Sequence, residues 1–227
     1  VRDPWQPFDD YAKVEAPEHS TFFLVPFKRK PGIDPTNVIQ PTRAVAYQLS
    51  EIGDEVNRAA GRGSEVAVHG IDAWRDSASG RQELRELTSV TAQASSGIRM
   101  HWLYFDADSP AKLEAAGFTY DSTWGYNDAV GYRAGSSQVF RLAGTKSLLE
   151  LPLSIMDSAL VFPTRMSLRS DQGVSLCRAT HENARRFGGA LAANWPQRTL
   201  ATEALCDRPH PPSRTVSVAR ALQGLPA

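Results

Sequence analysis

The chain of 227 residues contains only two cysteines, Cys177 and Cys206. Two thiols cannot build a disulfide framework or complete a tetrahedral zinc site alone, so cysteine usage predicts a reducing compartment, the cytoplasm. An excess of charge is also missing, because 25 Lys and Arg residues balance 25 Asp and Glu residues. Nucleic acids and anionic membranes are bound by concentrated basic surfaces, so this balance argues against both as the main partner.

Long apolar segments and an initiator methionine are absent as well. No apolar run approaches the ~20 residues that span a bilayer, and no charged segment followed by an apolar one opens the chain. The sequence starts at Val1, and its three methionines are Met100, Met156 and Met166. We therefore expect that the chain begins inside a longer reading frame or is a processed product. The sequence leaves the oligomeric state open.

The short motifs of the common nucleotide, metal and nucleophile sites are not found. The sequence contains no G-x-x-x-x-G-K-[ST], G-x-G-x-x-G, H-E-x-x-H, C-x-x-C or G-x-S-x-G segment. P-loop and dinucleotide binding, zinc-protease chemistry and a nucleophile elbow therefore have no support.

Short apolar runs alternate with amphipathic stretches, which is the pattern of a parallel sheet with crossover helices. Strands are predicted at residues 21–25, 65–70, 97–104 and 190–195, and helices at residues 8–16, 51–60, 80–90, 109–116 and 171–187. Residues 148–155 form a further apolar run. The proline-rich residues 28–43 are predicted to form a loop. We expect one α/β domain over residues 1–206, with a barrel-like closed sheet, and a Pro-rich, poorly ordered tail over residues 207–227.

Polar side chains occur at or near the ends of the predicted strands: His69, Arg99 with His101, and Asn194. Loops that follow the strands of parallel α/β folds collect the functional residues, so this distribution predicts a site there. Structural interpretations remain open for single residues. His69 can be a hydrogen-bonded structural histidine rather than a metal ligand, and Asp72 can cap the turn that follows it.

Five aromatic residues fall in or near the same predicted strand-end loops: Trp74, Trp102, Trp124, Tyr126 and Tyr132. Sugars stack their apolar C–H faces on such rings, so the cluster favours a carbohydrate groove. Packing in the hydrophobic core is an equally good interpretation for Trp102.

Seven short segments between residues 7 and 205 follow one another in a specific order. They are Pro7-Phe8-Asp9-Asp10-Tyr11, Ser20-Thr21-Phe22-Phe23, Glu65-Val66-Ala67-Val68-His69-Gly70, Gly97-Ile98-Arg99-Met100-His101, Gly117-Phe118-Thr119-Tyr120-Asp121-Ser122, Gly131-Tyr132-Arg133-Ala134-Gly135 and Gly188-Gly189-Ala190-Leu191. Their order resembles the polysaccharide deacetylase (NodB-homology) family. The resemblance implies a distorted (β/α) barrel that removes N- or O-acetyl groups from sugars. It also implies a divalent metal, zinc or a similar ion, held by an aspartate and two histidines, with a further aspartate as base and a late histidine as acid.

Carried over residue by residue, the resemblance assigns catalytic roles to three positions. His69 resembles the first metal histidine, Arg99 the arginine that orients the catalytic aspartate, and Asp121 the aspartate of the fourth motif. His69 is thus the predicted metal ligand. The remaining pocket is predicted to be lined by substrate-binding residues: Asp72, Trp74, His101, Trp124, Tyr126, Arg133 and Asn194.

Several groups of the family pattern are replaced or missing. The second metal histidine would fall at Ala73, and Pro196 takes the place of the late histidine. The segment His101-Trp102-Leu103 replaces the proline–tyrosine part of the arginine motif. The aspartate pair should lie upstream of Val1, so the expected barrel is incomplete and lacks its first strand. Catalytic zinc usually has three protein ligands, and we therefore expect little activity from this chain alone.

Three interpretations follow from these residues. The leading one is a polysaccharide deacetylase-like hydrolase that acts on carbon–nitrogen or ester bonds of acetylated sugars and is impaired here by truncation and degenerate motifs. The alternative is a non-catalytic barrel that binds glycans or a protein partner, because Ala73 and Pro196 delete chemistry and leave the scaffold intact. The third is a damaged gene product, since the Pro-rich end after Asp207 differs from the helix that should close a barrel.

Overall fold

The computed structural model describes residues 20–195, which divide into two compact units. The large unit comprises residues 20–124 and 139–151, and the small unit comprises residues 125–138 and 152–195. The helix predicted at residues 8–16, the position of Pro196 and the tail at residues 207–227 lie outside the described residues.

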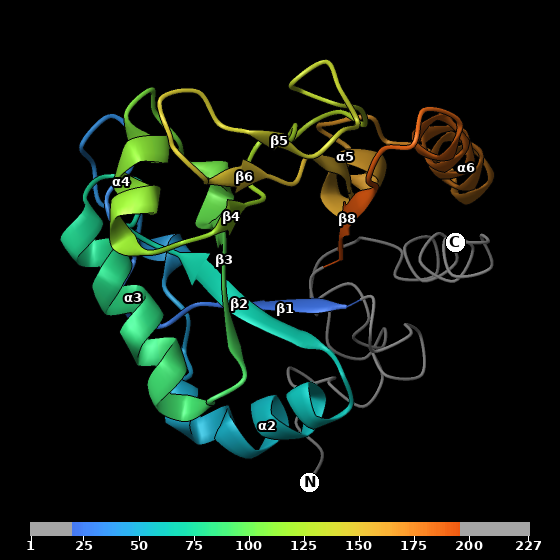
Figure 1. The fold of residues 1–227 in the computed structure, drawn as a ribbon. Helices are drawn as coiled ribbons and strands as arrows, with labels where there is room; N and C mark the ends of the chain where they lie inside the picture. The colour runs from blue at the N-terminus through green and yellow to red at the C-terminus, as the bar shows by residue number, and fades with distance from the viewer. Residues whose placement is uncertain (1–19, 196–227) are drawn as a thin grey trace, which may run out of the picture. The chain divides into compact units, whose positions relative to one another are not determined.

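A six-stranded sheet with the strand order β1-β2-β3-β4-β6-β5 runs through the large unit (Figure 1). Its strands are β1 (Thr21–Leu24), β2 (Glu65–Gly70), β3 (Ala94–Met100), β4 (Tyr120–Asp121), β6 (Leu149–Glu150) and β5 (Phe140–Arg141). Neighbours from β1 to β6 pair in parallel, and β5 pairs with β6 antiparallel at the edge. The predicted α/β class with parallel strands is confirmed.

Three helices make the crossovers that parallel strands require. They are α2 (Gly53–Gly61), α3 (Ser77–Val90) and α4 (Ser109–Ala116), and Figure 1 shows them along one side of the sheet. Local signals in the sequence set their ends. The Asp76 carboxylate accepts a hydrogen bond from the Ser79 backbone N–H at 2.8 Å at the start of α3. Gly117, at φ 102°, ends α4 in the left-handed conformation that favours glycine.

Alternation along β2 and β3 separates an apolar face from a polar one. Val68 pairs with Ile98, and both side chains are fully buried. The next residues, His69 and Arg99, are also register partners and point to the opposite face, because successive side chains of a strand alternate. The register of this strand pair therefore brings two predicted site residues side by side.

One predicted strand is wrong in its extent. The strand predicted at residues 97–104 ends at Met100, because His101–Leu103 form a tight turn in which Trp102 has a φ of 64°. Trp102 and Tyr104 therefore do not continue the strand face of Ile98. The apolar run at residues 148–155 is divided between β6 and a strand of another sheet, β7 (Leu153–Met156).

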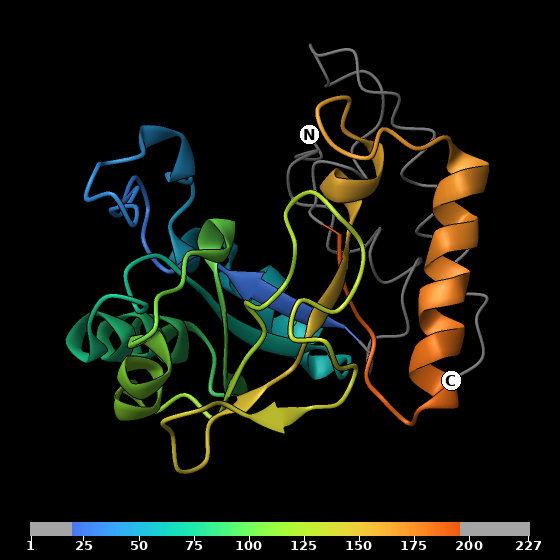
Figure 2. The same ribbon diagram turned by 90° about the horizontal axis from the view of Figure 1, so that it is seen from above.

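The small unit contains a two-stranded parallel sheet, formed by β7 and β8 (Ala192–Asn194), and two helices, α5 (Asp157–Val161) and α6 (Ser170–Arg186). Its core is made of Ile155, Leu160 and Cys177. The helix α6, seen at its full length in Figure 2, confirms the helix predicted at residues 171–187.

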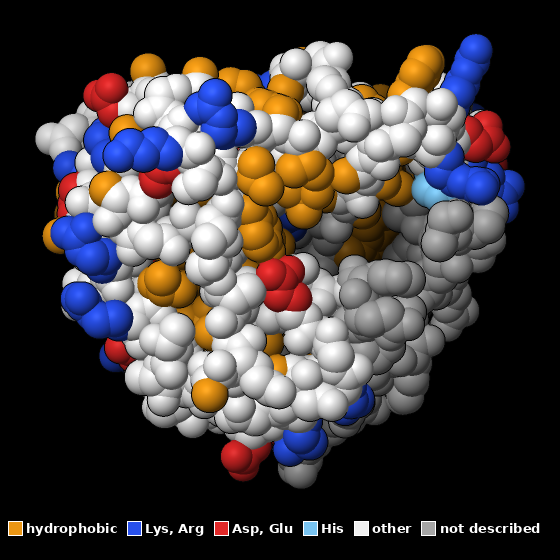
Figure 3. Space-filling model, viewed as in Figure 1, with side chains coloured by type: hydrophobic (Ala, Val, Ile, Leu, Met, Phe, Trp, Pro, Cys, Tyr) orange, Lys and Arg blue, Asp and Glu red, His pale blue; other side chains and the backbone are white. Residues whose placement is uncertain are grey.

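None of the helices between residues 20 and 195 is both long and apolar enough to cross a membrane. Lys and Arg side chains are interspersed with Asp and Glu side chains on the face that Figure 3 draws.

Gly97 is required by close packing between β3 and β4. A Cβ at this position would overlap the ring of Tyr120, whose hydroxyl donates a hydrogen bond to the Glu65 carboxylate at 2.8 Å. We predict that Gly97→Ala lowers the free energy of unfolding by about 1–3 kcal/mol, the usual range for overpacking. Urea denaturation measures this, with Gly61→Ala as the matched control because nothing lies within 4 Å of a Cβ there. Equal stabilities of the two variants would contradict the prediction.

Candidate active site at the strand ends

The carboxyl ends of β2 and β3 fix His69 in one tautomer. His69 Nδ1 lies 2.8 Å from the backbone carbonyl oxygen of Arg99. A carbonyl only accepts, so Nδ1 carries the proton and Nε2 keeps its lone pair. Burial lowers the pKa of His69 to about 4, so the ring is neutral at pH 7. A neutral imidazole with an unprotonated Nε2 can accept a proton or ligate a metal.

A second imidazole lies beside the first. The ring centroids of His69 and His101 are 4.7 Å apart, and the rings are tilted by 45°. His101 opens the turn that follows β3, while His69 stands on β2. The structure thus brings together a predicted catalytic residue and a predicted substrate-binding residue.

Arg99 is buried and held from several sides. Its Nε donates to the Ser122 carbonyl oxygen at 3.0 Å, and its Nη2 donates to Ser122 Oγ at 2.8 Å. The guanidinium also lies over the ring of Phe23, 4.3 Å from the centroid. Burial lowers the pKa of Arg99 to about 10, which leaves it cationic at neutral pH. The structure therefore provides a fixed positive charge beside His69.

The third predicted catalytic residue, Asp121, lies on the other face of the sheet. Asp121 is the register partner of Ile98, whose side chain points away from the Arg99 face. It is also the register partner of Glu150 on β6, and both carboxyl groups are fully buried. The predicted catalytic trio is therefore split: His69 and Arg99 share a face, and Asp121 belongs to a carboxyl pair opposite.

The buried carboxyl groups of Asp121 and Glu150 are placed to share a proton. Asp121 Oδ1 accepts from Thr123 Oγ1 at 2.5 Å, and Glu150 Oε1 accepts from the Trp124 N–H at 3.0 Å. Asp121 Oδ2 and Glu150 Oε2 have no hydrogen-bond donor among residues 20–195. Burial raises the pKa of Asp121, and burial together with the Asp121 carboxylate raises the pKa of Glu150 well above neutral. One proton shared between Asp121 Oδ2 and Glu150 Oε2 would satisfy both carboxyl groups. Glu150 was missed by sequence reasoning, although an acidic residue inside the apolar run 148–155 was a usable signal.

Two polar residues attach the loop at residues 28–43 to the strand ends. Asp72 accepts from the Ile33 N–H at 3.3 Å and pairs with Lys30 Nζ at 3.2 Å, so its side chain binds this loop. Arg43 is 1% exposed, and its Nη2 donates to the carbonyl oxygens of Ile71 (3.2 Å) and His101 (3.1 Å). Nothing in the sequence of this proline-rich loop marked Arg43 as the residue that joins both strand ends.

The other predicted substrate-binding residues lie in different surroundings. Trp74 is 6% exposed, and Trp124 makes an edge contact with Phe105 and a tilted ring contact with Phe140. The remaining three, Tyr126, Arg133 and Asn194, belong to the small unit, where Arg133 Nη1 donates to the Gly125 carbonyl oxygen at 3.4 Å.

The described residues do not fit a complete catalytic metal site. Between residues 20 and 195, no group of three or more His, Cys, Asp or Glu side chains is placed to hold a metal ion. His69 offers one nitrogen. Ala73, the position expected for the second histidine, is fully buried. A Cβ on Gly80 of α3 would lie 3.4 Å from the Ala73 Cβ. This position therefore packs against a helix.

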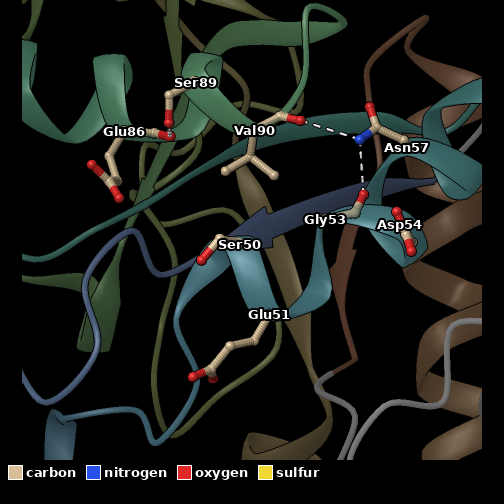
Figure 4. A pocket seen from close by; sticks show the side chains of 8 residues that line it. All are labelled: Ser50, Glu51, Gly53, Asp54, Asn57, Glu86, Ser89 and Val90. Atoms are coloured by element: carbon tan, nitrogen blue, oxygen red, sulfur yellow. Dashed lines mark hydrogen bonds between the residues drawn. The ribbon is translucent and has the colours of Figure 1, made fainter.

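A cleft of about 400 Å³ lies elsewhere in the large unit, between α2, α3 and the short 3₁₀ helix η3 (Leu49–Ile52) (Figure 4). Two of its three acidic residues have partners: Glu51 pairs with Lys28 at 2.6 Å, and Glu86 accepts from Gln48 Nε2 at 3.1 Å. None of the strand-end residues described above lines this cleft.

Comparisons with known proteins support the fold. No family model and no curated protein matches the sequence. The structure is similar to the crystal structure of a "putative polysaccharide deacetylase" from Mycobacterium smegmatis, with a TM-score of 0.55 and 22% sequence identity. The match covers 86% of this chain and 63% of that chain, so the chain spans less than two thirds of its neighbour's length. The resemblance inferred from the sequence is confirmed at the level of the fold.

The buried carboxyl pair generates a pH prediction. A carboxyl whose pKa is raised in the folded state binds more protons folded than unfolded, so the free energy of unfolding falls as pH rises from about 5 to 8. We predict that Glu150→Gln, which keeps a hydrogen-bond donor toward Asp121 but does not titrate, reduces this fall by about 1 kcal/mol or more, since one pKa unit corresponds to about 1.4 kcal/mol.

Urea denaturation at several pH values measures this fall. Glu182→Gln, at an exposed position of α6, is the control and should keep the wild-type slope. An unchanged slope in Glu150→Gln would show that the pair does not share a proton.

Proposed function

We propose that the chain is a carbohydrate deacetylase-type domain that hydrolyses N- or O-acetyl groups of sugars. The observation that carries the proposal is the pairing of His69 and Arg99 at the ends of parallel strands, in a fold shared with a protein named as a polysaccharide deacetylase. In this proposal the sheet is part of a distorted (β/α) barrel of the NodB-homology type. Functional residues of such folds gather at the carboxyl ends of the strands.

The reaction sets clear chemical requirements. A water molecule attacks the acetyl carbonyl carbon, the C–N or C–O bond breaks, and acetate leaves together with the amine or alcohol. This chemistry needs a base for the water proton, a stabiliser for the oxyanion and an acid for the leaving group. The 176 residues from 20 to 195 supply a part of this set, since they lack a complete metal shell.

Each strand-end residue has a role that its geometry favours. His69 would offer Nε2 to the divalent ion, because Nδ1 is engaged by the Arg99 carbonyl oxygen. Arg99, fixed by Ser122, would position a carboxylate base through its buried charge. His101 would contact the sugar beside His69. A zinc-type ion, when bound, would activate the attacking water.

A non-catalytic glycan-binding domain is the second candidate. It is favoured by the position of Ala73, which packs toward α3 and so leaves His69 without the second ligand of the family pattern. A domain of this kind would bind acetylated oligosaccharides at the same strand ends and release no acetate.

Acetate release from acetylated oligosaccharides tests the proposal. The assay uses the 227-residue chain, and any longer natural form that contains it, with added zinc or cobalt. We predict that His69→Ala and Arg99→Lys lower the rate by about 10²-fold or more, the scale of general acid–base assistance. His181→Ala, on α6 in the small unit, is the control and should keep the wild-type rate.

Two outcomes would contradict hydrolysis at these strand ends. Acetate release that persists in His69→Ala would place the reaction elsewhere. Binding of oligosaccharides without acetate release in any form of the chain would favour the second candidate.

A further inference from the structure

The turn after β3 holds Trp102 in an unfavourable backbone conformation. Trp102 has φ 64° and ψ 16°, and the next residue, Leu103, has φ 57°. Neither residue is glycine, so both have a Cβ that makes the left-handed backbone conformation sterically unfavourable. Strain of this kind persists only where the surrounding structure enforces it, and it concentrates at functional sites.

Buried contacts on both sides of the turn enforce this conformation. Before Trp102, the His101 carbonyl oxygen accepts a hydrogen bond from buried Arg43 at 3.1 Å. After it, Leu103 is 8% exposed, and Tyr104 lies under the Arg43 guanidinium, 4.4 Å from the ring centroid. The residues that flank Trp102 are thus held, while Trp102 itself is 41% exposed.

Trp102 belongs to a row of aromatic rings that begins at the candidate site. Successive ring centroids along His69, His101, Trp102, Tyr104 and Trp74 are 4.7, 6.1, 6.2 and 6.3 Å apart. Trp74, at the far end, is buried, and so it cannot offer the stacking surface that the sequence predicted for it. Trp102 is the largest of these side chains that reaches solvent.

We propose that Trp102 is a stacking platform for a pyranose ring next to His69, and that the strained turn exists to present it. The ligand class is an oligosaccharide of gluco-configured pyranoses, free or N-acetylated, whose equatorial substituents leave an apolar face of axial C–H groups. Such a face stacks on an indole ring. This inference rests on the proposed function for the position of the sugar, although stacking itself requires no hydrolysis.

Three substitutions at Trp102 distinguish the effect of the indole ring from the effect of the backbone strain. Trp102→Gly removes both, Trp102→Ala removes the ring and keeps the Cβ, and Trp102→Phe keeps an aromatic ring. Glycine adopts positive φ without steric cost, so Trp102→Gly should melt at a higher temperature than Trp102→Ala. Both should weaken the binding of N-acetylglucosamine tetramers and hexamers at least tenfold, whereas Trp102→Phe should stay within about threefold of wild type.

Isothermal titration calorimetry and thermal melting of the full chain give the two readouts. Phe187→Ala removes an aromatic side chain that is 65% exposed in the small unit, and it should leave binding unchanged. The proposal that Trp102 is a stacking platform would be overturned if Trp102→Gly and Trp102→Ala bound the oligomers with wild-type affinity. It would also be overturned if the wild-type chain bound neither oligomer. Failure of the proposed function has a different signature: no acetate release, with Trp102-dependent binding intact.

Discussion

The parallel pairing of β2 with β3 is the constraint on which the candidate site depends. This register places His69 opposite Arg99 on one face and Val68 opposite Ile98 on the other. A slip of one residue would exchange the two faces and bury His69 among apolar side chains. The hydrogen bond from His69 Nδ1 to the Arg99 carbonyl oxygen, which sets the tautomer, joins the same two register partners.

Buried charged side chains around this strand pair make hydrogen bonds to the backbone. Arg43 and Arg99 donate to carbonyl oxygens at the strand ends, and Glu83 accepts from the backbone N–H groups of Ile71 and Asp72 at 3.1 and 2.7 Å. Burial raises the pKa of Glu83 to about 7, so this carboxyl can also take up a proton near neutral pH. Buried polar groups of this kind stabilise a fold when they are bonded, and they define one arrangement of the strand ends.

Local pattern was enough to predict the parallel α/β class, β2 and the ends of α4, because apolar alternation, a proline at the helix start and Gly117 act within a few residues. Contacts distant in sequence were not predictable. Arg43 and Glu150 act through partners that only the tertiary structure brings near, and the face of Asp121 depends on register. The turn at Trp102 was read as strand because alternation from Ile98 onward continues past Met100, although buried neighbours enforce another conformation.

The chain crosses between the two units at residues 124–125, 138–139 and 151–152, so the small unit is assembled from two separated stretches. During synthesis, residues 125–138 emerge before the strands and helices at residues 152–195 that complete their unit. For example, the Gly131 N–H can donate its hydrogen bond to the Ser154 carbonyl oxygen only after residue 154 has been synthesised. The same holds for the hydrogen bond from the Tyr132 hydroxyl to the Thr180 carbonyl oxygen. The large unit likewise needs residues 139–151 to add β5 and β6. Neither unit can therefore fold to completion before the chain has passed residue 151, and no single cut releases one of them whole.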